Sequence, residues 1–185
     1  MYNILIRMII MTNKIRVIWI NGAFGAGKTT IAEELQRALP NSYLFDPEQA
    51  ASFINHVIPS ELKLSDFQDY QEWRKINRLM LNKLVSQYSG VIIIPMTITN
   101  EKYYYEITRD IDQTIIKRFL LVADKETLKN RLITRGDYIG SWPYQQIDRC
   151  LRAFNQNEIW QPIKTIDQTV DVVVSSIIEQ LKIEN

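Results

Sequence analysis

Apolar and polar residues alternate in blocks along this chain, and the apolar blocks are of two kinds. Short and nearly continuous apolar runs lie at 15–20, 42–45, 91–94, 115–122 and 162–166. Such runs are typical of strands that are buried on both faces of a parallel sheet. Between them, apolar residues recur three or four positions apart, as on one face of a helix. Five strands that alternate with helices predict an α/β domain of three layers around a mainly parallel sheet.

Capping residues and apolar spacing place the predicted helices. Ser65, Thr99 and Asp124 are expected to cap three of them, because their side chains accept hydrogen bonds from the first turn. The segment 170–181 is rich in β-branched residues, but its apolar positions follow helical spacing behind Thr169, so we predict a helix. The helix that ends before Pro59 is expected to bury Phe53, Ile54, Val57 and Ile58. The long helix after Ser65 is expected to bury Trp73, Ile76, Met80, Leu84 and Tyr88.

No repeat, low-complexity segment or linker-like run divides the 185 residues, so we expect a single domain over 14–185. A polar stretch within 134–150 interrupts the helical pattern and is interpreted as a small lid. Residues 1–13 are expected to be an appendage, with Met11 as a candidate native start. The apolar run at 4–11 is too short to span a bilayer, and no small-residue cleavage site follows it.

Composition and charge narrow the class of partner. Hydrophobic residues make up 46% of the chain and charged residues 23%, which is ordinary for a soluble globular protein. The net charge of +1 creates no basic field, so nucleic acid and anionic membranes are not expected partners. The only cysteine, Cys150, cannot form an intramolecular disulfide and is compatible with a reducing compartment. We therefore expect a cytoplasmic protein without a transmembrane segment.

Three of the six glycines lie close together in "VIWINGAFGAGKTT", residues 17–30. The stretch fits the phosphate-binding pattern Gly-x-x-x-x-Gly-Lys-Thr, and it leaves a predicted strand and opens a predicted helix, as the pattern requires. Backbone N–H groups in such a loop point at the phosphates of ATP, aided by the helix dipole. Lys28 is expected to reach the β- and γ-phosphates, and the Thr29 hydroxyl to bind Mg²⁺. The predicted ATP contacts are Gly22, Ala23, Phe24, Gly25, Ala26, Gly27, Lys28, Thr29 and Thr30.

Asp46 ends the second predicted strand, at the sheet edge where the glycine loop also lies. Ligands bind at this carboxyl edge in parallel α/β sheets. Pro47 keeps Asp46 out of helical geometry, which directs its carboxylate across the edge toward Lys28. The carboxylate is a candidate to accept a proton from a substrate hydroxyl, or to hold Mg²⁺ through water. The other interpretation is a turn or helix-capping aspartate.

Arg131 and Arg135 lie one helical turn apart and therefore share a face, directed at whatever the segment 136–141 covers. An arginine on a lid would stabilise the charge that spreads over a phosphoryl group in transfer. Arg149 and Arg152, on the other side of the polar stretch, are candidates for the second half of such a lid.

Several segments together resemble the tunicamycin-resistance protein family. They include the glycine loop, "FDPE" at 45–48, "PMT" at 95–97 and "QIDRC" at 146–150, and the resemblance runs in order from Ile15 to Ile178. This family is allied to the nucleoside-monophosphate, gluconate and antibiotic kinases. The resemblance implies a P-loop fold of the nucleoside-monophosphate-kinase type, with strand order 2-3-1-4-5, a mobile lid, and ATP with a small molecule as ligands.

The resemblance also suggests roles for single residues. It implies that Arg131 packs on the adenine and that Arg135 reaches the transferring phosphate. The acceptor in related kinases lies near the helical segment after the second strand, which makes Trp73 and Arg74 candidates, together with Thr97 and Arg149. Related kinases often carry an acidic residue after the third strand, where it holds Mg²⁺ through water. This chain has Pro95 and Thr97 there instead.

The sequence therefore predicts a Mg²⁺-dependent kinase that phosphorylates a hydroxyl of a small molecule, with a tunicamycin-type nucleoside antibiotic as a candidate acceptor. Its catalytic residues are expected to be Lys28, Asp46 and Arg135. Two alternatives stay open. The first is a non-catalytic protein that binds ATP and sequesters the antibiotic, which the missing carboxylate after the third strand favours. The second is a metabolite kinase of the gluconate or shikimate type.

Overall fold

A computed structural model of the chain describes residues 14–156 and 158–182. Its centre is one sheet of five parallel strands in the order β2-β3-β1-β4-β5. This confirms the α/β class and the expected strand order. In chain order the strands are β1 (Val17–Gly22), β2 (Ser42–Leu44), β3 (Val91–Pro95), β4 (Ile116–Val122) and β5 (Gln161–Lys164).

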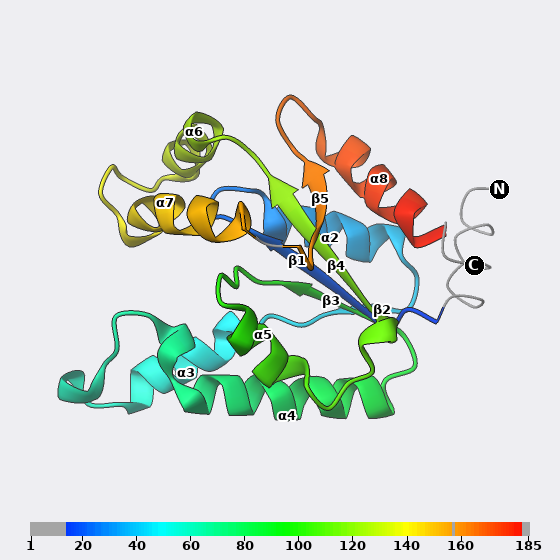
Figure 1. Ribbon diagram of the computed structural model, residues 1–185, viewed down its shortest axis with the longest axis horizontal. Coiled ribbons are helices and arrows are strands. Elements are labelled where there is room, and N and C mark those ends of the chain that lie inside the picture. Colours follow the sequence, from blue (N-terminus) through cyan, green and yellow to red (C-terminus); the bar gives the residue numbers. More distant parts are fainter. Residues whose placement is uncertain (1–13, 157, 183–185) are drawn as a thin grey trace.

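Helices cover both faces of the sheet (Figure 1). Successive side chains of a strand point to opposite faces, and β1, which has strands on both sides, is buried throughout. Its Val17 and Trp19 pack with α3, α4 and α5, whereas Ile18 and Ile20 pack with α2, α6, α7 and α8. The helices are α2 (Lys28–Ala38), α3 (Glu48–Val57), α4 (Gln71–Gln87), α5 (Glu101–Thr108), α6 (Lys125–Arg135), α7 (Trp142–Phe154) and α8 (Val170–Lys182).

The valine-rich segment near the C-terminus is helical, as its apolar spacing predicts. The backbone N–H of Val172 donates to the Thr169 hydroxyl at 3.4 Å, so Thr169 begins α8 as expected. Asp124 begins α6 in the same way by accepting from the backbone N–H of Thr127. No helix within the described residues is long and apolar enough to cross a membrane.

Two predicted helix starts are wrong. Asp66, not Ser65, caps a short 3-10 turn at Phe67–Asp69, so α4 starts only at Gln71. Asn100, not Thr99, caps α5 by accepting from the backbone N–H of Lys102. In each case an Asx side chain one position further along the chain caps the element, and Asp and Asn cap helices at least as well as Ser and Thr.

The predicted apolar stripe of α4 is rotated in the structure. Trp73 and Leu81 are fully buried as part of the core, but Met80 is exposed and the polar Asn77 is buried. The Asn77 amide donates to the carbonyl oxygens of Pro47 and Trp73, which satisfies it in the interior. On α3 the expected core residue Ile54 is buried, but Phe53 and Val57 are exposed and Ala51, which was not predicted, is buried.

Asn21, near the end of β1, ties this central strand to the segment after β3 at the carboxyl edge of the sheet. Its amide donates to the carbonyl oxygen of Ile98 at 2.8 Å, and its side-chain oxygen accepts from the backbone N–H groups of Gly22 and Ile98. All three bonds are buried, where hydrogen bonds are strong. Asn21 therefore fixes the start of the glycine loop against the segment after β3.

Candidate active site

The loop between β1 and α2 has a backbone that only glycine adopts easily. Gly25 and Gly27 have φ angles of +85° and +94°, in the left-handed region. A Cβ on Gly25 would lie 2.6 Å from the carbonyl oxygen of Leu128, so α6 packs directly on the loop. The two glycines are therefore required by the conformation of the loop and, at Gly25, by the close approach of α6.

Lys28 is the first residue of α2, and its ammonium lies inside the curve of the loop. It donates to the carbonyl oxygens of Gly22 and Ala23, each at 3.1 Å, and lies 5.3 Å from the centre of the Phe24 ring. Burial lowers the pKa of Lys28 to about 8, and the attraction of Glu48 opposes this shift only in part. The ammonium is thus poorly solvated, and a nearby anion would stabilise its charge.

This pKa predicts a pH-dependent affinity for nucleotide. A phosphate favours the charged form of Lys28, so binding raises its pKa, and the contribution of this charge is complete below pH 8. It is lost as the pH rises through about 8, because the free protein must then take up a proton to bind. We expect the dissociation constant for MgATP to rise on the order of tenfold between about pH 7 and about pH 9.5, as measured by titration calorimetry.

Lys28→Arg is the control for this prediction, because a guanidinium stays charged throughout that pH range. Its affinity for MgATP should be nearly constant across the same range. A wild-type affinity that does not change with pH would contradict the assignment of Lys28 to the phosphates.

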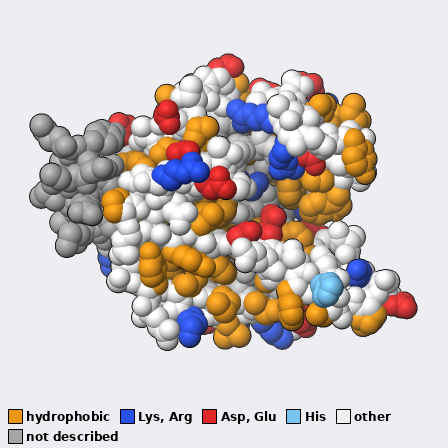
Figure 2. Space-filling view, turned by 180° about the vertical axis from the view of Figure 1, so that it is seen from behind, with side chains coloured by type: hydrophobic (Ala, Val, Ile, Leu, Met, Phe, Trp, Pro, Cys, Tyr) orange, Lys and Arg blue, Asp and Glu red, His pale blue; other side chains and the backbone are white. Residues whose placement is uncertain are grey.

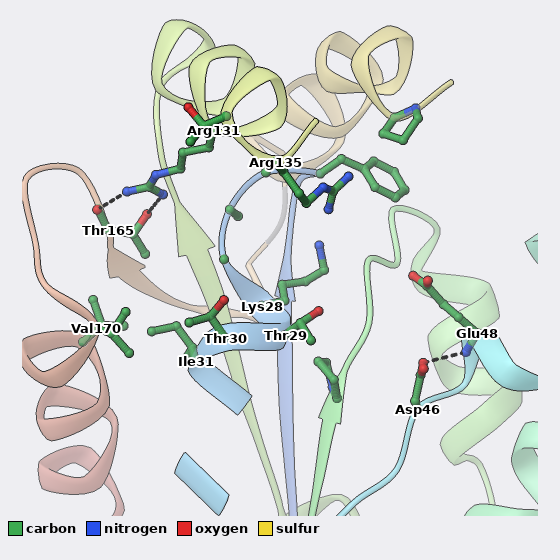
Figure 3. Close-up of a pocket in the computed structure, with 18 of the residues that line it drawn as sticks. Lys28, Thr29, Thr30, Ile31, Asp46, Glu48, Arg131, Arg135, Thr165 and Val170 are labelled. Carbon is green, nitrogen blue, oxygen red and sulfur yellow. Dashed lines mark hydrogen bonds between the residues drawn. The ribbon is translucent and has the colours of Figure 1, made fainter. Parts of the chain in front are cut away.

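The loop opens into a cavity of about 850 Å³ at the carboxyl edge of the sheet. In Figure 3, Lys28, Arg135 and Glu48 point into it from three sides, while Arg131, Thr165 and Val170 form its far end. The cavity brings Asp46, Arg131 and Arg135 together with seven of the nine predicted loop residues, and the other two, Gly22 and Ala23, do not line it. Its lining also includes residues that were not predicted: Leu44, Glu48, Phe67, Thr134, Trp142, Pro143, Thr165, Gln168, Val170 and Val173.

Asp46 lies at the cavity, as predicted, but its carboxylate is already engaged. One oxygen accepts from the backbone N–H of Glu48 at 2.9 Å, so Asp46 holds the start of α3 (Figure 3). The neighbouring Glu48 carboxylate projects toward Lys28 instead. Loss of solvent raises the pKa of Glu48, with Lys28 and Arg135 opposing the shift and Asp46 reinforcing it. Two carboxylates therefore lie at the Lys28 end of the cavity, and they have different surroundings.

The two arginines of α6 lie at different ends of the cavity. Arg131 donates to the hydroxyl and the carbonyl oxygen of Thr165, at 3.0 and 2.7 Å, which holds its guanidinium beside the loop between β5 and α8 (Figure 3). Arg135 lies one turn further along, over Lys28, and forms an ion pair with Asp137 at 2.8 Å. More than half of the Arg135 side chain is exposed, so it is accessible to a ligand in the cavity.

The oxygen groups near Lys28 suit Mg²⁺, which prefers hard oxygen ligands and keeps several waters. Thr29 is exposed at the cavity, and the carboxylates of Asp46 and Glu48 lie across from it. Within the described part of the chain, no three His, Cys, Asp or Glu side chains gather as an all-protein metal site. The arrangement therefore fits an ion that arrives with a nucleotide.

Three predicted acceptor residues are not available to a ligand here. Trp73 is fully buried, and its ring N–H donates to the carbonyl oxygen of Pro47 at 2.9 Å. Thr97 is also fully buried, and its hydroxyl donates to the carbonyl oxygen of Gly22. Arg74 forms an ion pair with Glu106 and stacks over Tyr103, 4.1 Å from the ring centre. Core packing and ion pairing thus occupy all three side chains, and we leave them out of the site.

Arg149, the fourth predicted acceptor residue, does not line the cavity. Its guanidinium lies 2.7 Å from a carboxylate oxygen of the buried Asp66, so it ties α7 to the turn that carries Phe67. The expected lid over 134–150 includes α7 residues Ile147 and Cys150, which are buried in the core. Movement of this segment stays a prediction.

Among the residues that sequence reasoning missed, Glu48 and Thr165 have the clearest places in the site. A glutamate in the first turn of a helix is common because the helix dipole favours it, so Glu48 carries no special signal. Thr165 follows a short strand whose end defines the carboxyl edge, and this position was the available clue.

Comparisons with known proteins agree with this fold. A family model described as AAA domain matches residues 18–161. The tunicamycin resistance protein of Deinococcus radiodurans has a similar structure, with a TM-score of 0.72, 23% identity, and coverage of 90% of this chain and 95% of that one. No curated protein matches the sequence.

Two kinases of known structure are also similar. A gluconokinase from Sinorhizobium meliloti 1021 has a TM-score of 0.65 at 15% identity and covers 90% of this chain and 91% of its own. A shikimate kinase from Bacteroides thetaiotaomicron has a TM-score of 0.61 at 19% identity, with coverage of 91% and 99%. At these identities the likeness shows a shared fold, which confirms the fold that the sequence resemblance implies.

Proposed function

We propose that this chain, which belongs to the AAA domain family, is an ATP-dependent phosphotransferase that acts on a hydroxyl group of a small molecule. The observation that carries the proposal is the composition of the cavity. One end presents Lys28 within its glycine loop and Arg135 above it, and the carboxylate of Glu48 faces both. Phosphoryl transfer requires mainly positioning and neutralisation of charge, and these residues supply both.

The proposed reaction assigns the two ends of the cavity to the two substrates. The base of ATP lies beside Arg131, Thr165 and Val170, and its phosphates lie in the loop against Lys28. A hydroxyl oxygen of the acceptor forms a bond to the γ-phosphorus while the bond from that phosphorus to ADP breaks. A carboxylate at the phosphate end receives the hydroxyl proton, and Arg135 stabilises the charge on the transferring group.

Mg²⁺ bound by the Thr29 hydroxyl would neutralise phosphate charge when it accompanies the nucleotide. The carboxylates of Asp46 and Glu48 would accept hydrogen bonds from its waters. The protein's own residues supply the remaining functions: the loop orients the phosphates, and α6 presents both arginines.

The proposed identity of the acceptor rests on the likeness of this chain to proteins of known structure. A tunicamycin-type antibiotic is our first candidate, because the chain shares its fold with a tunicamycin resistance protein and its sequence segments resemble that family. A protein that only sequesters such a compound is the competing proposal, since no carboxylate directly follows β3. The test is to incubate the protein with MgATP and a panel of hydroxyl compounds that includes tunicamycin, following ADP and product mass together. Acceptor binding without acceptor-dependent ADP would favour sequestration.

Nucleotide binding itself should stabilise the fold. A ligand that binds only the folded state, present at about 100 times its dissociation constant, raises the free energy of unfolding by about 2.7 kcal/mol. For a chain of this size that corresponds to a rise in Tm of about 5–10 °C. Lys28→Ala should lose most of this rise when measured by thermal unfolding with MgATP. Lys83→Ala, which removes an exposed ammonium on α4, should retain it, and equal shifts in the two variants would argue against a nucleotide site at Lys28.

A further inference from the structure

Positive charge in the cavity is confined to the nucleotide side. The described residues that line it include three cations, Lys28, Arg131 and Arg135, which come from the glycine loop and α6. The two carboxylates, Asp46 and Glu48, come from the opposite side, where β2 leads into α3. Figure 2 shows this division, with basic side chains above the hollow and acidic ones below it. The phosphates of ATP would engage these cations and add negative charge of their own.

The arginines nearest the acceptor side are neutralised by partners. Arg74 pairs with Glu106, and its guanidinium also donates to the carbonyl oxygen of Gln68. Arg149 pairs with Asp66, which is buried. Separation of either pair by an acidic ligand would leave a partly or fully buried carboxylate uncompensated, which is strongly unfavourable. Each arginine is therefore already paired with a carboxylate, and neither lines the cavity.

The remaining walls near the acceptor side are apolar and partly aromatic. Phe24 and Trp142 meet edge to face with 5.1 Å between ring centres, and both line the cavity. Phe67 lines it as well and is held by Trp73 from behind, at 5.3 Å between ring centres. Pro95 and Pro143 complete this surface. Such walls favour ligands that present a ring or an aliphatic face.

We infer that the acceptor is a hydroxyl compound without negative charge that presents an apolar ring or chain to Phe24, Phe67 and Trp142. This inference rests on the proposed function for the role of the hydroxyl, and it narrows the substrate class. It excludes sugar acids and phosphorylated metabolites, because a carboxylate or phosphate here would face Asp46 and Glu48 while the bound nucleotide engages Lys28, Arg131 and Arg135. Like charges a few ångströms apart near a protein surface weaken binding at least tenfold.

A matched set of probes tests the charge and the ring separately. Phenyl β-D-glucoside and phenyl β-D-glucuronide differ chiefly in one carboxylate, and methyl β-D-glucoside lacks the ring. Each is titrated calorimetrically into the wild-type protein saturated with Mg²⁺ and a non-hydrolysable ATP analogue. We expect phenyl glucoside to bind at least about tenfold more tightly than the glucuronide, and more tightly than methyl glucoside. Glu48→Gln should bring the two phenyl compounds closer in affinity.

The double variant Asp66→Asn/Arg149→Met is the control, because it removes both charges of the pair and leaves neither one buried alone. The preference for the glucoside over the glucuronide should be the same in this variant as in the wild type. Equal or tighter binding of the glucuronide by the wild type, or no binding of any probe, would overturn the inference. So would a preference that changes by tenfold in the double variant.

Transfer assays separate this inference from the proposed function. If MgATP phosphorylates the glucuronide as efficiently as the glucoside, the inference fails and the phosphotransferase stands. If the glucoside binds preferentially and neither compound nor any other acceptor receives a phosphoryl group, the inference on the ligand stands and the phosphotransferase fails.

Discussion

Glu48→Gln is expected to lower kcat for phosphoryl transfer by about 10²–10⁴-fold, the usual contribution of a positioned general base. Glutamine keeps the size of the side chain and removes its ability to take a proton. Glu48 is our choice because its carboxylate projects toward Lys28 and Arg135, and because loss of solvent raises its pKa, which makes it a better proton acceptor. Acceptor-dependent ADP formation measures the change, with titration calorimetry to show that nucleotide still binds.

Asp46→Asn is the matched control for Glu48→Gln. The side-chain oxygen of asparagine still accepts from the backbone N–H of Glu48, so the start of α3 is retained. We expect kcat of this variant to stay within about tenfold of the wild type, since asparagine keeps the contact with α3 and its amide oxygen still accepts a hydrogen bond from a metal-bound water. The opposite result, with Asp46→Asn inactive and Glu48→Gln active, would make Asp46 the base that the sequence predicts.

Arg135→Ala is expected to lower kcat by about 10³-fold or more, which is the effect of removing an arginine that stabilises the transferring phosphoryl group. Its guanidinium lies over Lys28 at the end of the cavity where the γ-phosphate is expected, and its charge would act chiefly in the transition state. The dissociation constant for MgATP should therefore change far less than kcat does. Steady-state kinetics combined with calorimetry distinguish the two effects.

Two further variants, Arg131→Ala and Arg135→Lys, serve as comparisons for Arg135→Ala. Arg131 lies at the far end of the cavity beside Thr165, so its loss should weaken nucleotide binding and leave kcat at saturation nearly unchanged. Lysine at 135 keeps the charge without the planar fork of donors, and its kcat should fall between those of wild type and alanine. If Arg135→Ala keeps the wild-type kcat, Arg135 takes no part in phosphoryl transfer.

The fold was predictable because each strand and helix has a strong local signal. Continuous apolar runs mark the strands, and helical spacing identified α8 in spite of its valines, since the periodicity of buried positions outweighs propensity. One error arose because two neighbouring residues, Ser65 and Asp66, can both cap a helix. Another arose because Asn77 is buried through hydrogen bonds that depend on Pro47, which is distant in sequence.

The candidate site was predictable where the spacing itself carries the chemistry. The glycine loop and the pair Arg131 and Arg135 line the cavity, because their positions follow from one loop and one helical turn. Arg74 and Arg149 looked equally suitable in sequence, but their partners Glu106 and Asp66 are remote and cannot be paired from spacing. Glu48 was missed for the converse reason: its importance depends on Asp46 being engaged by the α3 backbone.

The fate of the γ-phosphoryl group decides whether this protein is a phosphotransferase. ATP labelled with ¹⁸O in that group is incubated with the protein, Mg²⁺ and either tunicamycin or phenyl β-D-glucoside, and the acceptor is analysed by mass spectrometry. We expect one labelled phosphoryl group on the acceptor for each ADP formed, and none with Lys28→Ala. An acceptor that binds tightly and emerges unmodified, with the label absent or found only in free phosphate, would contradict this expectation.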